Sequence, residues 1–124
     1  MKYTISEALN ILRPDSPWNL NGSEYSDLEW LDSSTTKPTE SELNTKVAEL
    51  DAAEPMRLLR EERDVLLSET DWMVTRSIET GVAMSNDWKT YRQTLRDLPA
   101  SSSPSLNQYY DLDFSSVTWP SKPS

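Results

Sequence analysis

Residues 85–99 read SNDWKTYRQTLRDLP and predict the helix around which the rest of the fold is organised. Ser85 is a suitable N-cap, and Asp87 lies in the first turn, where the helix dipole favours negative charge. We expect Leu98-Pro99 to end the helix, because proline lacks the backbone donor that a further turn needs. Three large apolar or aromatic side chains follow the helical spacing i, i+3 and i+7 and share one face: Trp88, Tyr91 and Leu95.

Two further helical segments precede this stretch. Residues 56–67, MRLLREERDVLL, form a charge-laced helical pattern, which is typical of a solvated helix face or of a docking surface. Its i, i+4 pairs Arg57–Glu61 and Arg60–Asp64 favour a helix. Thr70 or Asp71 can cap a short helix that ends at Gly81. We expect the helical core to contain Leu59, Leu66, Trp72, Ile78, Trp88, Tyr91 and Leu95.

Residues 39–54 predict another helix. Thr39-Glu40-Ser41-Glu42 fits a capping box, and Leu43, Val47 and Leu50 then recur on one face. Pro55 follows directly, and a proline inside a helix removes a hydrogen bond and clashes with the preceding turn. We therefore expect a break or a kink near Ala53-Glu54.

The N-terminal region predicts a short helix and a hairpin. Thr4-Ile5-Ser6-Glu7 fits a second capping box, and the apolar residues after it run to Leu12, shortly before Pro14. Strand-like segments Trp18–Leu20 and Tyr25–Leu31 flank Asn21-Gly22, a dipeptide that favours a tight primed turn. Because two strands alone are marginally stable in water, this hairpin needs a surface to pack on.

The C-terminal region differs in composition. Residues 100–108 are rich in serine and predict a flexible linker, and the segments 109–114 and 117–120 look extended. Trp119-Pro120 can belong either to a strap that packs on its own domain or to a strand that binds a partner, for which Trp119 is a suitable aromatic anchor.

These patterns predict a mainly α fold: a small helical domain with an N-terminal helix and β-hairpin and an extended C-terminal tail. We divide the chain into an N-terminal helix and hairpin module (1–38), a helical domain (39–99), and a linker with an extended segment (100–124).

Composition narrows the class of function. The chain has 124 residues, 35% of them hydrophobic, and a net charge of −9, most of it within residues 1–54. An acidic chain repels phosphate, so we expect no binding to nucleic acid. Neither a membrane-spanning apolar run nor the apolar core of a signal peptide is present, which predicts a protein of the producing cell's cytosol with no membrane partner.

The residues offer little for catalysis. Without cysteine or histidine, the common metal ligands and the usual general base at neutral pH are missing. Glycosidases need two carboxylates, and the pairs Asp27/Glu29 and Asp111/Asp113 each share a strand face. Both pairs lack supporting groups and fit a solvated acidic surface better. We expect no enzyme activity, no cofactor and no metal.

Three motif blocks resemble those of the phage tail assembly chaperone family. Residues 60–72 (REERDVLLSETDW) resemble its R-x-x-R-D-x-L-L-x-x-T-D-W block, residues 88–99 its W-x-x-Y-R-Q-x-L-R-D-L-P block, and residues 117–123 its closing V-x-W-P-x-K-P. Many members carry an aspartate and a proline-rich turn soon after T-D-W, whereas residues 73–79 look helical here. Residues 18–42 are similar to a module of small proteins from phage tail-fibre loci, including those of cyanophages.

The resemblance implies a non-enzymatic factor that binds and shields a tail-fibre or baseplate protein during virion morphogenesis, in the host cytoplasm. It implies a homo-oligomer or a complex with a trimeric fibre. The alternative is a structural component of the virion tail. As hypothetical partner-binding residues we name Trp30, Arg92, Arg96, Phe114, Val117 and Trp119.

Overall fold

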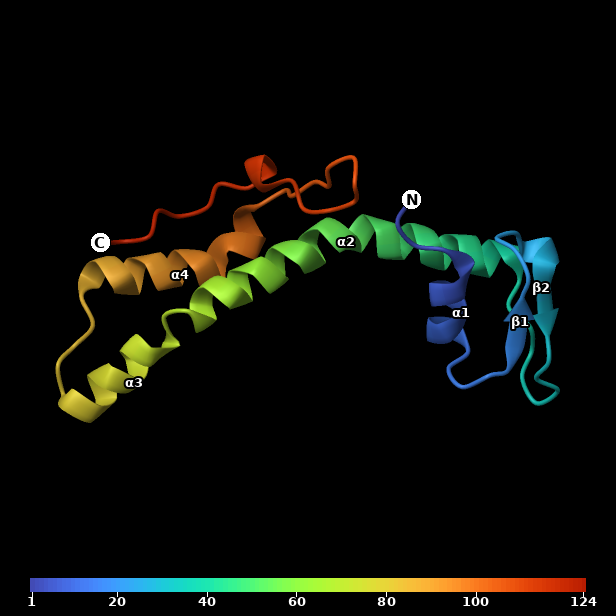
Figure 1. Cartoon of the computed structure of the whole chain (residues 1–124), viewed down its shortest axis with the longest axis horizontal. Helices are drawn as coiled ribbons and strands as arrows, with labels where there is room; N and C mark the ends of the chain where they lie inside the picture. Colours follow the sequence, from blue (N-terminus) through green and yellow to red (C-terminus); the bar gives the residue numbers. More distant parts are fainter. The chain divides into compact units, whose positions relative to one another are not determined.

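The computed structural model describes residues 1–124 and confirms a mainly α-helical fold with a small hairpin (Figure 1). Contacts group the chain into two compact units, Met1–Glu54 and Pro55–Ser124. The predicted division at residues 38 and 99 is not tested by this grouping and stays a prediction. The elements in chain order are α1 (Ile5–Leu12), β1 (Trp18–Leu20), η1 (Tyr25–Asp27), β2 (Leu28–Trp30), α2 (Glu40–Ser68), α3 (Asp71–Thr80), α4 (Asn86–Ser101) and η2 (Phe114–Ser116).

Helix α1 begins at the predicted capping box. The Thr4 side chain accepts a hydrogen bond from the Ser6 backbone amide, and the Glu7 carboxylate accepts one from the Thr4 amide at 2.8 Å. The side-chain bond from Thr4 lowers the pKa of Glu7 from its usual value. These contacts satisfy backbone donors that the first helical turn leaves unpaired.

The hairpin forms, but its turn is longer than predicted. Strands β1 and β2 pair antiparallel, with Trp18 opposite Trp30 and Leu20 opposite Leu28. The tight turn predicted at Asn21-Gly22 is therefore wrong, since residues 21–27 all lie in the connection and three of them form η1. The Asp27 carboxylate accepts a hydrogen bond from the Glu24 amide and lies where a Cβ on Gly22 would be, which explains the glycine.

The first unit has its own core, built from α1, the hairpin and the N-terminal half of α2. Tyr25 crosses from the hairpin to donate a hydrogen bond from its hydroxyl to the buried Pro38 carbonyl at 2.7 Å. The hairpin thereby gains the packing surface that two isolated strands lack. Six apolar side chains are buried together: Ile5, Ala8, Leu9, Leu28, Leu43 and Val47.

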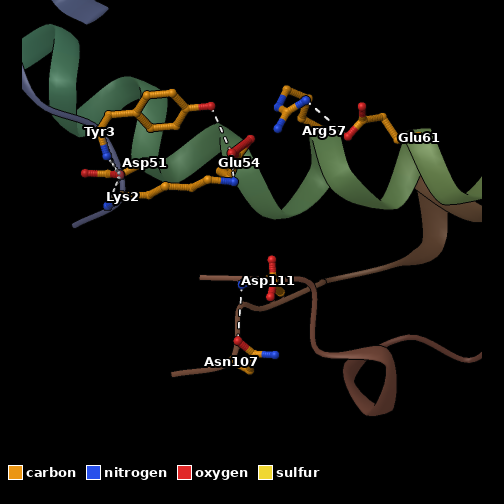
Figure 2. Close-up of polar contacts among 8 residues, drawn as sticks. All are labelled: Lys2, Tyr3, Asp51, Glu54, Arg57, Glu61, Asn107 and Asp111. Atoms are coloured by element: carbon orange, nitrogen blue, oxygen red, sulfur yellow. Dashed lines mark hydrogen bonds and ion pairs between the residues drawn. The ribbon is translucent and has the colours of Figure 1, made fainter. Parts of the chain in front are cut away.

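The predicted break before Pro55 does not occur, because α2 runs continuously from Glu40 to Ser68. The turn before the proline is held by the N-terminal residues, as Figure 2 shows. Asp51 accepts hydrogen bonds from the backbone amides of Lys2 and Tyr3 at 2.9 and 3.0 Å. The carboxylate of Glu54, which is 1% exposed, accepts the Tyr3 hydroxyl at 2.9 Å and pairs with the Lys2 ammonium at 2.6 Å. These contacts offset the cost of about 3 kcal/mol that a proline imposes on a helix interior.

Asp32 organises the segment that follows β2. Its carboxylate accepts hydrogen bonds from the hydroxyls of Ser34, Ser16 and Thr35 at 2.6, 2.7 and 2.8 Å. Hydrogen bonds to the charged form hold the pKa of Asp32 well below its usual value. One carboxylate thus connects the segment before β1 with the segment after β2.

The second unit begins with the remainder of α2 and continues through α3 and α4. Helix α3 starts after Thr70 and ends at Gly81 in the left-handed conformation (φ 72°), as predicted. Helix α4 starts after Ser85, also as predicted, but it continues through Pro99 to Ser101. The expected end at Leu98-Pro99 is wrong, since a proline in the last turn removes only one backbone bond and Leu98 is held in the core.

The predicted helical core is correct in part. Leu59, Tyr91 and Leu95 are buried, whereas Leu66 and Trp88 are half-buried. Trp72 and Ile78 were expected inside, yet they are 51% and 79% exposed. The buried cluster around Leu59 is completed instead by Leu98, Leu112 and Val117.

The C-terminal region packs on its own unit, which supports the strap alternative. Leu112 and Val117 are buried in one cluster with Leu59 of α2 and Leu98 of α4, and Trp119 packs against it. Residues 105–113 form a defined loop closed by a bridge between Leu106 and Leu112, although the composition of residues 100–108 predicted a flexible linker. The chain end also lies along α4, where residues 120–124 and Tyr91 line one crevice.

We predict that Leu112→Ala lowers the free energy of unfolding by about 2–5 kcal/mol, because it opens a cavity beside Leu59 and Leu98. Tyr109→Ala is the matched control in the same loop, since Tyr109 is 74% exposed, and should change stability by less than about 0.5 kcal/mol. Urea unfolding followed by circular dichroism measures both. Equal effects of the two substitutions would show that the C-terminal region does not contribute to the core.

We predict that Asp32→Asn lowers the melting temperature at pH 7 and that the difference from the unchanged chain shrinks as the pH falls below about 4. A depressed folded-state pKa stabilises the fold above the unfolded value of about 3.9, and this contribution is lost on acidification. Melting curves between pH 2 and pH 7 test this, with Glu29→Gln on the exposed face of β2 as control. A constant difference across that range contradicts the assignment.

Candidate partner-binding surface

Arg92 joins the three helices of the second unit. Its guanidinium donates hydrogen bonds to the Leu67 carbonyl near the end of α2, to the Thr70 hydroxyl, and to the Asp71 carboxylate at the start of α3. Thr70 is 2% exposed and the Arg92 side chain 11%. Buried polar groups must be paired, and a planar guanidinium can satisfy several acceptors at once. Arg92 therefore holds α4 against the junction between α2 and α3.

Helix α3 presents apolar side chains to solvent. None of its residues is buried, and Val74 and Ile78, one turn apart, are 39% and 79% exposed. Val82, just beyond the helix, is 67% exposed. On another side of α3, the guanidinium of Arg76 lies 5.2 Å from the ring centroid of the half-exposed Trp72. A helix of this length gains little stability by itself, and its exposed apolar residues make it a candidate binding surface.

A crevice of about 470 Å³ opens between α3 and α4. Val74 and Met84 supply its apolar lining, while Lys89, Arg92 and Arg96 of α4 supply positive charge. No carboxylate lines it, although the chain as a whole is strongly acidic. We call this crevice, together with Ile78 and Val82, the α3–α4 surface. Its chemistry suits a segment that carries both apolar and acidic side chains.

The two arginines predicted to bind a partner have different surroundings. Arg92 points inward and serves the fold, as described above. Arg96, one turn later, is exposed and donates a hydrogen bond to the Gln93 side chain at 2.6 Å while lining the crevice. Both arginines line the crevice, but Arg96 is the more exposed of the two, and the Arg92 guanidinium is already bound to Leu67, Thr70 and Asp71.

The predicted aromatic and aliphatic contacts are also divided. Trp30 is half-buried in the first unit and donates its indole hydrogen to the Thr35 carbonyl at 3.0 Å. Val117 is buried, and Trp119 is half-buried with an indole nitrogen that has no hydrogen-bond partner. Phe114 is 55% exposed, with its ring centroid 5.7 Å from that of Trp119. The structure does not bring these residues together with Arg96 into one site.

The α3–α4 surface includes residues that the sequence did not identify as a site. Ile78 was assigned to the core, while Val74, Val82, Met84 and Lys89 were assigned no role. The i, i+4 spacing of Val74 and Ile78 was a visible signal, but spacing alone does not say whether a face is covered by the same chain or by a partner.

One carboxylate of each pair considered for catalysis serves local structure. Asp113 accepts hydrogen bonds from the Ser115 amide and hydroxyl and begins η2, and Asp27 accepts from Glu24 as described above. Acidic side chains do not gather anywhere in a group of three or more that could hold a metal ion. None of the helices is both long and apolar enough to cross a membrane.

Comparison with known proteins assigns the second unit. A family model described as phage tail assembly chaperone protein matches residues 56–124, more than half of the chain and nearly the whole unit Pro55–Ser124. Among curated proteins and solved structures, no match was found. Arg92, Thr70, Asp71 and the α3–α4 surface all lie within the matched residues.

We predict that Arg92→Lys lowers the free energy of unfolding by about 1–3 kcal/mol, because an ammonium cannot satisfy the Leu67 carbonyl and the Thr70 hydroxyl in the same geometry. Arg96→Lys, a matched substitution one turn away on an exposed position, should leave stability unchanged. Chemical unfolding of both variants decides the matter, and an equal loss at Arg96 would refute the assigned role of Arg92.

Proposed function

Because the chain belongs to the phage tail assembly chaperone family, we propose that it binds a tail-fibre or baseplate protein and shields its apolar surface during virion morphogenesis. Family membership supports a role in tail assembly, and the finer identity of the partner is our proposal. A factor of this kind acts in the host cytoplasm before the tail is complete. It needs binding surfaces and no catalytic groups.

The exposed apolar part of the α3–α4 surface carries this proposal. Val74, Ile78 and Val82 are exposed although the chain has few apolar residues with which to build a core. Aliphatic side chains in water contribute nothing to folding, whereas each becomes favourable when a partner covers it, by about 25 cal/mol per Å² of buried apolar area. Their exposure within the matched unit is therefore best explained by binding.

The charge of the crevice indicates the kind of segment that binds. Lys89 and Arg96 line it together with Val74 and Met84, so a partner segment with a carboxylate beside an apolar side chain is complementary. The remainder of the chain is acidic, and residues 1–54 carry 11 acidic and 4 basic side chains. Net charge of this size keeps a complex soluble while apolar partner surface is being covered.

We predict that Ile78→Gln weakens binding to the cognate tail-fibre or baseplate protein by about 2 kcal/mol, roughly thirtyfold, while the fold persists. Ile11→Gln is the matched control, because Ile11 is also an exposed isoleucine on a helix, α1, outside the family match. The measurement is co-purification and soluble yield when each variant is coexpressed with the candidate partner proteins from the same phage.

Equal solubility of the partner with and without the unchanged chain would refute the shielding role. The composition of purified virions provides a second readout: an assembly factor should be absent or substoichiometric there, whereas a fixed copy number per tail would identify a structural component instead.

A further inference from the structure

The C-terminal loop of residues 107–114 projects aromatic and acidic side chains that the core does not use. Tyr109 is 74% exposed, Tyr110 43% and Phe114 55%, and the loop also carries Asp111. Exposed aromatic residues so close together are unusual on a chain with one phenylalanine and five tyrosines in total. We call residues 107–114 the aromatic loop.

The aromatic loop is held in one shape. The Asn107 side-chain oxygen accepts hydrogen bonds from the backbone amides of Tyr109 and Asp111 at 2.8 and 3.1 Å, the latter drawn in Figure 2. The Asn107 amide also donates to the Asp111 carbonyl at 2.8 Å. Tyr110 has φ 63°, a left-handed conformation that is costly for a bulky residue and persists only where its surroundings enforce it. A loop ordered in this way loses little entropy when it binds.

Burial explains the base of the loop but not its tip. Leu106 and Leu112 close the loop by a bridge, and Leu112 anchors it beside Leu59 and Leu98. Tyr109 and Asp111 contribute nothing to that cluster. Strain at Tyr110 and exposure at Tyr109 together point to recognition as the role of the tip.

The crevice of the α3–α4 surface has the complementary chemistry. It is concave, and it presents Lys89 and Arg96 beside Val74 and Met84. The aromatic loop combines the exposed carboxylate of Asp111 with the exposed ring of Tyr109. Different elements build the two features, since α3 and α4 form the crevice while α2 and the C-terminal region hold the loop. Every copy of the chain thus carries both a basic crevice with an apolar lining and an exposed loop with a carboxylate and aromatic rings.

We propose that the aromatic loop of one copy of this chain docks into the α3–α4 crevice of a second copy. Asp111 faces Lys89 and Arg96 in this contact, and the ring of Tyr109 covers the apolar lining. Each copy has one loop and one crevice. Two copies can therefore exchange loops as a reciprocal pair, or several copies can form a closed ring. The contact is electrostatic in part and weakens as salt screens it.

Self-association of this kind would cover the α3–α4 surface before a tail protein is available. This consequence rests on the proposed function, because it assumes that the same surface binds the tail protein. An incoming segment with apolar and acidic side chains would displace the loop by occupying the same crevice. The self-contact would thus protect exposed aliphatic residues during the interval between synthesis and tail assembly.

Charge reversal on the full chain tests the contact. One variant carries Lys89→Glu and Arg96→Glu, so its crevice repels an unchanged loop; the other carries Asp111→Lys, so its loop repels an unchanged crevice. All three positions are exposed and none takes part in the Arg92 contacts, and circular dichroism confirms that each variant is folded. Sedimentation velocity from micromolar to millimolar protein, at low and high salt, measures the mass of each sample.

We expect the unchanged chain to self-associate at low salt and each variant alone to do so at least about tenfold more weakly, equivalent to about 1.4 kcal/mol. An equal mixture of the two variants should regain association, because each reversed loop then meets a reversed crevice. Tyr109→Ala should weaken association without changing its dependence on salt.

Three outcomes would overturn the proposal: a monomer throughout the concentration range, association that neither reversal changes, or a mixture that associates no better than its separate components. A monomeric chain that still binds and solubilises the tail protein would refute the self-contact alone. A chain that self-associates as described but binds no tail protein would refute the proposed function alone.

Discussion

The contacts of the Arg92 guanidinium are the interaction on which the rest of the second unit depends. They connect the Leu67 carbonyl, the buried Thr70 hydroxyl and the Asp71 carboxylate, so that three helices are positioned by one side chain. A chain that is 35% hydrophobic has too few apolar side chains to pack every helix into a core. Polar contacts at the base of α3 hold that helix in place without apolar packing along its length. The aliphatic residues of α3 can therefore stay exposed.

Local signals in the sequence were sufficient for most helix ends. The capping box at Thr4, the helix start after Ser85 and the left-handed Gly81 each depend on residues within one turn, so the neighbouring sequence reveals them. The proline at position 55 was misinterpreted because its effect depends on residues far away in the sequence. Lys2 and Tyr3 hold the turn before it through Asp51 and Glu54, and no local pattern contains that information.

The candidate site was harder to predict than the fold for a related reason. Arg92 and Arg96 lie four residues apart and look equivalent in the sequence. Thr70 and Asp71 bind the guanidinium of Arg92, however, whereas Arg96 stays exposed. Likewise, helical spacing groups Ile78 with other apolar residues but does not reveal which face is covered. The side chains that cover Leu59 and Leu98 are Leu112 and Val117, which lie in a region whose composition predicted a linker and an extended tail.

The family motif blocks contain much of the scaffold of the second unit, whereas the apolar part of the candidate surface lies outside them. Thr70, Asp71, Tyr91, Arg92, Leu95 and Val117 belong to the blocks at 60–72, 88–99 and 117–123, and these residues are buried or bound to one another. The exposed apolar residues Val74, Ile78 and Val82 lie between the first two blocks. Residues that build a scaffold are constrained by their neighbours within the chain, whereas residues on a binding surface are constrained by the partner. The contacts that hold the helices of the second unit together therefore do not depend on the exposed apolar residues of the interval 73–87, beside which Lys89 and Arg96 of α4 line the same crevice.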